Sequence, residues 1–247
     1  MGEVRHLRNA PILEANVDFR VTMSKGFDVQ AFRNLADVLP GYPTVEAWHR
    51  LQTSFTFREG RPEPPVSETG PGGYVYRSAD AFSVAQFRID GFTYSRLRPY
   101  TSWDDIYPEV IRLWGVYRRV GRPEACSRIG VRYINKIELP DGTVELNDYL
   151  IAPPRVPEGV PDSMTSFLTR IIVKDPEHDR FAIVGQSSQV ELGAGPTSWI
   201  LLDIDAFRTA DGGLEARVED TLEQLHDLKN RIFFGSVRDE IIKERYE

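Results

Sequence analysis

The stretch Arg128-Ile-Gly-Val-Arg-Tyr-Ile-Asn-Lys-Ile-Glu-Leu139 decides how the chain folds. Apolar side chains occupy every second position over most of this stretch, and charged side chains occupy the positions between them. Because successive side chains of a β-strand point to opposite faces of the sheet, the pattern predicts one long strand with a buried and a solvated face. Asn135 interrupts the apolar face and Ile134 interrupts the polar one.

Similar alternation on both sides of this stretch predicts further strands, at 13–21, 51–57, 81–89, 92–97, 167–173, 181–192 and 199–207. Asp90-Gly91 favours a tight hairpin between two of them, because both residues accept positive φ angles. Helical spacing of apolar residues predicts helices over 28–39, 102–120 and 215–234, and a short last helix.

These elements predict an α+β fold: a curved, mainly antiparallel sheet with two long helices packed on one face. Strands lead to a long helix twice in the chain, which indicates a weak internal duplication. We expect a single domain over 1–247, with flexible loops at 58–73 and 151–163. The first loop has eight Pro or Gly in sixteen residues, which is typical of a lid or of a tolerated insertion.

The composition excludes several classes of protein. The 247 residues carry a net charge of -7, which argues against a general nucleic-acid binder, since such proteins need a cationic surface. Cys126 is the only cysteine, so neither an intrachain disulfide nor a cysteine-based metal site is expected. No apolar run is long enough to span a membrane, and the first residues lack the apolar core of a signal peptide. We therefore expect a cytoplasmic protein without membrane contact.

The basic residues are unusual in kind, with 25 Arg against five Lys. Ten of the Arg lie between Arg77 and Arg132, and several of them fall on predicted strands. Arg binds carboxylates and phosphates with two parallel hydrogen bonds. The pattern is compatible with surface ion pairs and also with a local basic patch for a small anionic ligand.

Motifs that would identify a catalytic or cofactor site are absent from the sequence. It contains no dinucleotide-binding, Walker, zinc-protease or nucleophile-elbow signature, and no cofactor is expected. Asp203 and Asp205 lie two apart on one predicted strand, so both carboxylates share a face and could hold a divalent cation. A solvated outer face of a strand gives the same spacing.

Four residues are candidates for a ligand-binding cup: Arg132, Tyr133, Asn135 and His226. Tyr133 and Asn135 share the apolar face of the long strand, and Arg132 lies on the opposite face. A buried Asn needs a hydrogen-bond partner, which is either another part of the fold or a ligand. His226 lies on the longest predicted helix, where a half-exposed histidine beside the apolar stripe is the alternative interpretation.

Four blocks of sequence resemble a sporadically distributed family of uncharacterised bacterial proteins. These blocks are Ala-Pro-Ile-Leu-Glu-Ala at 10–15, Arg-Tyr-Ile-Asn-Lys-Ile at 132–137, Leu-Leu-Asp-Ile-Asp at 201–205, and Leu-His-Asp at 225–227 with the downstream Phe233 or Phe234 and final helix. The resemblance implies a cytoplasmic bacterial accessory protein, with no established activity or catalytic residues to transfer. Families distributed in this way are often associated with mobile or defence gene clusters.

Two classes of function follow from these observations. The first is a non-catalytic binding or protein-interaction module with an unknown protein partner. The alternative is an enzyme or ligand cup that acts on a small anionic substrate, built from the Arg cluster with Asp203, Asp205 and His226. A nucleic-acid role is a third and weaker hypothesis.

Overall fold

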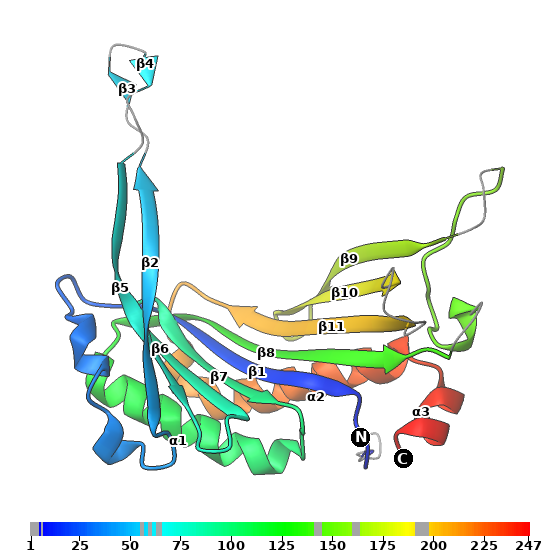
Figure 1. The fold of residues 1–247 in the computed structure, drawn as a ribbon, viewed down its shortest axis with the longest axis horizontal. Helices are drawn as coiled ribbons and strands as arrows, with labels where there is room; N and C mark the ends of the chain where they lie inside the picture. The colour runs from blue at the N-terminus through cyan, green and yellow to red at the C-terminus, as the bar shows by residue number, and fades with distance from the viewer. Residues whose placement is uncertain are drawn as a thin grey trace.

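The computed structural model describes residues 5, 7–54, 57–58, 61–62, 66–140, 145–159, 164–190 and 198–247. Within them, nine strands form one antiparallel sheet in the order β2-β5-β6-β7-β1-β8-β11-β10-β9 (Figure 1). The strands of this sheet are β1 (Ile12–Thr22), β2 (Thr44–Ser54), β5 (Val66–Arg77), β6 (Ser83–Arg88), β7 (Gly91–Leu97), β8 (Ala125–Glu138), β9 (Ser166–Asp175), β10 (Arg180–Val190) and β11 (Ser198–Thr209). Two short strands, β3 (Phe57–Arg58) and β4 (Arg61–Pro62), pair separately.

The centre of the sheet is the antiparallel pair β1 and β8, in which Val17 lies opposite Val131. The alternation in both sequences determines their faces. Val17, Phe19, Val131 and Tyr133 are fully buried in the main hydrophobic core, while Arg132 and its even-numbered neighbours lie on the other face. The prediction of a long half-buried strand around 128–139 is confirmed.

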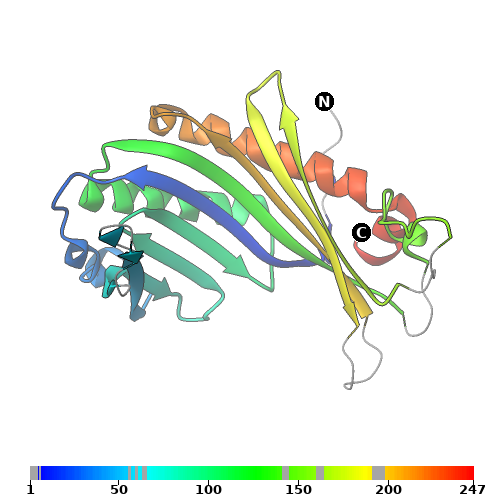
Figure 2. The same ribbon diagram turned by 90° about the horizontal axis from the view of Figure 1, so that it is seen from above.

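Three α-helices occur in the described residues: α1 (Trp103–Gly121), α2 (Val218–Ser236) and α3 (Asp239–Arg245). The hydroxyl of Ser102 accepts a hydrogen bond from the backbone N–H of Asp105 and so caps α1. α1 packs against β7, and α2 packs against β8 and β11 (Figure 2). Leu113 of α1 and Leu225 of α2 are fully buried in the same core as the central strands.

The same order of elements occurs twice along the chain. In the first part, β1 is followed by the meander β5-β6-β7 and then by α1; in the second, β8 is followed by the meander β9-β10-β11 and then by α2. The last strand of each meander lies beside the strand that precedes the meander in the chain. β7 lies beside β1, and β11 lies beside β8. The additional strand β2 pairs with β5 at the outer edge of the first half.

The α+β class and the antiparallel sheet are confirmed, and α3 corresponds to the predicted short last helix. Other segments differ from the prediction. Residues 28–39 form two short 3-10 helices, η1 (Val29–Phe32) and η2 (Ala36–Val38), instead of one α-helix. Residues 66–73, predicted as part of a flexible loop, belong to β5. Residues 151–159 contain neither helix nor strand, and 160–163 lie outside the described residues.

The two ends of the chain are joined near α3 (Figure 1). The backbone N–H of Asn9 donates a hydrogen bond to the carbonyl oxygen of Tyr246, and Arg5 forms ion pairs with Asp239 and Glu247. These contacts place the N-terminal segment beside α3 and the C-terminal residues. Among the described residues, no helix has both the length and the apolar character that a membrane crossing requires.

Candidate functional site

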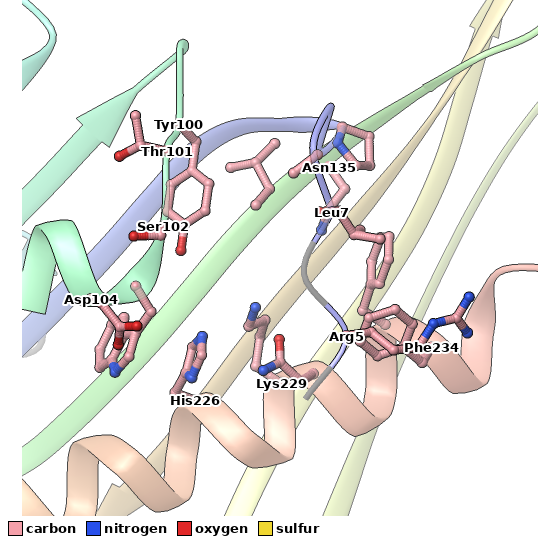
Figure 3. A pocket seen from close by; sticks show the side chains of 16 residues that line it. Arg5, Leu7, Tyr100, Thr101, Ser102, Asp104, Asn135, His226, Lys229 and Phe234 are labelled. Carbon is pink, nitrogen blue, oxygen red and sulfur yellow. The ribbon is translucent and has the colours of Figure 1, made fainter. Parts of the chain in front are cut away.

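A pocket of about 260 Å³ lies between the N-terminal segment, the start of α1, β8 and α2 (Figure 3). We call it the α1–α2 pocket. Its walls are mainly apolar and aromatic, and they include Leu7, Ile12, Tyr100, Trp103, Phe233 and Phe234. The polar lining residues include Ser102, Asn135, His226 and Lys229. Residues from both halves of the fold therefore line one pocket.

Lys229 is the most unusual side chain in this pocket. It is buried, with 6% of its surface exposed, and its Nζ lies 3.8 Å from the centroid of the Tyr133 ring. The described residues offer this ammonium no carboxylate and no hydrogen-bond acceptor. Burial lowers the pKa of Lys229 to about 7, since a charged amine without a counter-ion is unfavourable in the interior. The Tyr133 ring face offsets part of this cost through a cation–π contact.

His226 lies one helical turn before Lys229 and borders the same space (Figure 3). Its imidazole stacks on the indole of Trp103, with ring centroids 4.4 Å apart and planes 8° apart. Burial, together with the nearby Lys229 charge, lowers the pKa of His226 to about 3. The imidazole is therefore neutral at physiological pH and contributes a flat polar wall rather than a second cation.

Hydrogen bonds fix the sheet side of the pocket. The hydroxyl groups of Tyr100 and Tyr133 lie 3.0 Å apart and bond to each other. The side-chain amide of Asn135 donates to the carbonyl oxygen of Leu202 on β11 at 3.0 Å. The β1–β8 pairing shifts register beside Ile12, which lies opposite Asn135. Such irregularities re-aim side chains, and both of these residues line the pocket.

The remaining charges around the pocket do not neutralise Lys229. Arg5 at the rim is already engaged by Asp239 and Glu247, and its guanidinium lies 5.2 Å from the centroid of the Phe234 ring. Asp104 is the single carboxylate among the described lining residues, and it is exposed in the first turn of α1. Lys229 is thus the one lining cation whose charge the described residues leave without an ion pair.

The structure divides the predicted ligand residues between two faces of the sheet. Tyr133, Asn135 and His226 come together at the α1–α2 pocket, where Asn135 and His226 line the space and the Tyr133 ring lies 6.2 Å from the His226 ring. Arg132 points to the opposite face, where it binds Asp203 through two hydrogen bonds of 2.8 and 2.6 Å. Adjacent residues of a strand cannot reach the same side.

The opposite face carries a ladder of ion pairs rather than a free basic patch. Asp18 lies at its centre and accepts hydrogen bonds from Arg20, Arg88, Arg128 and Thr93. Burial raises the pKa of Asp18, but the surrounding Arg residues and the Thr93 hydroxyl outweigh it, so that the pKa lies below its ordinary value. Within this ladder the strand-borne Arg side chains bind neighbouring carboxylates.

Asp203 and Asp205, the predicted metal ligands, belong to this ladder. Both carboxylate oxygens of Asp205 accept from Arg128 at 2.8 Å, and both oxygens of Asp203 accept from Arg132. A cation would have to displace these two guanidinium groups. In the part of the chain that the structure describes, no cluster of three or more His, Cys, Asp or Glu side chains could hold a metal.

Sequence reasoning missed Lys229, although the sequence contains a signal for it. Leu222, Leu225, Lys229 and Phe233 follow one another at spacings of three or four residues, so Lys229 interrupts the apolar stripe of α2. A lysine in such a stripe is either partly exposed or buried at a considerable cost. Only the packing of its Nζ against the Tyr133 ring distinguishes the two.

Neither a scan against protein-family models nor a search of the curated proteins finds a match to this chain.

Proposed function

We propose that the protein binds a small organic anion in the α1–α2 pocket and that it acts as a binding protein rather than as a catalyst. The observation that carries this proposal is the ammonium of the buried residue Lys229, which lines the pocket and has no ion-pair partner among the described residues. Buried charges in proteins are normally paired, because an isolated one costs several kcal/mol. A bound anion would supply the missing partner.

The walls of the pocket indicate the rest of the ligand. Tyr100 lies toward one end of the pocket and Phe234 toward the other, while Lys229 lies between them (Figure 3). A volume of about 260 Å³ suits a compact molecule. A carboxylate attached to a flat or apolar body matches this arrangement, since the ring walls would cover the body and Lys229 would bind the charge.

The alternative, an enzyme that acts on a small anion, receives less support from the same geometry. The Ser102 hydroxyl is engaged as the cap of α1, and His226 is stacked on Trp103 with a pKa far below 7. No hydrogen bond joins these two groups in the described structure. A nucleophile needs an adjacent base to be activated, so the pocket lacks the pairing that acyl-transfer chemistry requires.

A direct test measures binding of benzoate by isothermal titration calorimetry at pH 6.5, for the wild-type protein and the Lys229→Met variant. Benzyl alcohol serves as the uncharged counterpart of benzoate, and inorganic phosphate serves as an anion without an apolar body. Lys25→Met is the matched control, because Lys25 is exposed in the turn after β1 and is not among the residues that line the pocket. We expect benzoate to bind the wild-type and Lys25→Met proteins.

Lys229→Met removes the ammonium that would pair with the benzoate carboxylate, so it should weaken benzoate binding by at least tenfold. Truncating one member of a buried charge pair costs about 2–5 kcal/mol. Benzyl alcohol and phosphate should each bind more weakly than benzoate. Binding should also weaken above pH 7, where Lys229 loses its proton. Equal affinities in the two lysine variants, or no binding of benzoate to the wild-type protein, would contradict the proposal.

A further inference from the structure

The strand β9 forms one edge of the nine-stranded sheet and pairs only with β10. Its ten residues run without a register shift against β10. Large apolar side chains project from it into solvent: Leu168 is 80% exposed, Ile172 58%, Ile171 57% and Val173 37%. A long, regular edge with exposed apolar side chains is a template for another strand, and monomeric proteins usually block such an edge with a bulge, a Pro or a covering segment.

The first half of the same sheet shows what covers this kind of edge. β5 is the counterpart of β9, because each is the first strand of its meander and lies third from the central strand of its half. The outer edge of β5 is covered by β2, which pairs with it antiparallel from Thr44 to Ser54. No strand covers the corresponding edge of β9 in the described residues (Figure 2). The outer edge of β5 is therefore covered by an antiparallel strand, whereas the corresponding edge of β9 is open in the described residues.

We infer that β9 pairs antiparallel with β9 of a second copy of this chain, across a twofold axis that passes between the two Ile171 residues. In an antiparallel pair related by such an axis, opposed residues lie on the same face of the joined sheet. The two copies together then form one continuous sheet whose helix-bearing faces coincide.

The sequence of β9 favours this register. Centring the pair on Ile171 places Arg170 opposite Ile172 and Lys174 opposite Leu168, so the aliphatic stems of the two basic side chains cover apolar neighbours. A centre at Arg170 would oppose two guanidinium groups, and a centre at Ile172 would oppose Arg170 and Lys174. Like charges directly opposite each other destabilise a strand pair.

A second copy accounts for both exposed faces of β9. Ile171 and Val173 lie on the same face of the sheet as the core residues Val184 and Ala182 of β10, which are their pairing partners. Leu168 and Ile172 lie on the opposite face. A partner β9 brings the same apolar side chains to both faces at once, so that all four residues lose exposed area together.

The test combines sedimentation equilibrium with cysteine cross-linking of the full chain. Across the proposed axis, positions 171 of the two copies lie directly opposite each other, within the Cα separation that a disulfide spans. Ile171→Cys should therefore give a covalent dimer under mild oxidation. Val45→Cys is the matched control, because Val45 is 45% exposed on β2 at the other edge of the sheet. The native Cys126 is buried and should not cross-link.

The wild-type protein should sediment as a dimer at micromolar concentration. Ile171→Lys should sediment as a monomer, because the substitution places two ammonium groups, one from each copy, opposite each other at the axis. Circular dichroism should show an unchanged fold for this variant, since the side chain is exposed in the monomer. A monomeric wild-type protein, a dimer that persists in Ile171→Lys, or cross-linking at position 171 no more efficient than at position 45 would overturn the inference. Leu168→Cys tests the register and should not cross-link to itself, because Leu168 lies opposite Lys174.

Discussion

The ammonium of Lys229 and the carboxylate of Asp18 are both largely buried, but their surroundings differ. Asp18 accepts hydrogen bonds from three Arg side chains and from Thr93, so its charge is well compensated. Lys229 has only the face of Tyr133. Retaining an uncompensated buried charge lowers stability, and a protein that keeps one usually uses it at a site. This contrast is why we assign the site to the face of the sheet that carries α2.

Replacing Lys229 by Met should stabilise the protein in the absence of ligand. Met fills a similar volume without a charge, and such replacements of buried ionic groups are worth about 1–4 kcal/mol. The gain depends on pH. Below pH 7 Lys229 is charged in both states and the folded state bears the full cost; from about pH 7 to 10.5 the unfolded state binds more protons, so wild-type stability rises with pH.

Urea unfolding of the two proteins between pH 6 and 10 measures this difference. The free energy of unfolding of Lys229→Met should exceed that of the wild-type protein at pH 6, and the two values should converge toward pH 10. The slope of the difference cannot exceed about 1.4 kcal/mol per pH unit for one group. A difference that stays constant across this range would show that Lys229 keeps an ordinary pKa in the folded protein.

Single residues also show how far a sequence determines a site. Side chains alternate along the long strand, which places Tyr133 and Asn135 on one face and Arg132 on the other, and the structure has this arrangement. The pairing of Arg132 with Asp203 follows only from the β8–β11 register, which places Asp205 opposite Arg132 and Asp203 opposite Ile134. Register depends on contacts distant in sequence, so the ion-pair ladder was not predictable from local patterns.

At the scale of elements, the sequence predicted most reliably where one face of a strand or helix is buried. The strands β1, β8 and β11 each alternate between the core and a polar face, and α1 begins at Trp103, within one residue of the start predicted at 102. Burial of a single face imposes a period of two or of 3.6, which local sequence records. These central elements were therefore predictable without knowledge of the topology.

Two segments show where local patterns fail. The apolar residues Val29, Phe32, Leu35 and Leu39 are buried as the helical pattern requires, but the chain meets this requirement with two 3-10 turns. The glycines at 70–73 suggested a loop, yet they lie in β5. A Cβ on Gly73 would overlap the backbone of Phe87 and Arg88 on β6, so glycine is needed there for close approach of two strands.

Gly91 at the start of β7 should be similarly intolerant of a side chain. It pairs with Arg20 of β1 and with Arg88 of β6, and a Cβ at this position would overlap the carbonyl oxygen of Phe19. Because the obstacle is backbone rather than a flexible side chain, Gly91→Ala should force β7 away from β1. We expect a loss of about 2 kcal/mol or more in the free energy of unfolding, measured by thermal and urea denaturation.

Gly115 provides the matched control for this prediction. It lies inside α1, and no atom comes within 4 Å of the point that an alanine Cβ would occupy, so Gly115→Ala has space and gains helix propensity. This substitution should stabilise the protein by about 0.5–1 kcal/mol. If Gly91→Ala were as well tolerated as Gly115→Ala, the close approach of β7 to β1 would be incorrect.

At the scale of the whole molecule, the α1–α2 pocket joins the two halves of the fold. Tyr100 comes from the connection between β7 and α1 in the first half, and Trp103 is the first residue of α1. Asn135, His226 and Lys229 come from β8 and α2 in the second half. The N-terminal segment closes one side through Leu7. Neither half contains the site alone, which is why a sequence pattern confined to one segment could not reveal it.

The repeat of strand and helix order was visible in the sequence only as a weak similarity, because the two halves do not align residue by residue. The structure shows it in the topology, with β7 and β11 in corresponding places beside the central strands β1 and β8. Topological correspondence depends on pairing between segments that are distant in the chain, and sequence periodicity carries no information about it. The open edge at β9 becomes evident only through this comparison.

The pKa of Lys229, measured by NMR with the ε-carbons of the lysines labelled with carbon-13, tests the central claim most directly. The chain has five lysines, so the Lys229 resonance can be assigned as the one that disappears in Lys229→Met. We predict that it titrates near pH 7 in the free protein and that saturating benzoate shifts its pKa upward, because a bound carboxylate stabilises the charged form. A resonance that titrates near 10.5 and does not respond to benzoate would contradict a ligand-binding role for this lysine.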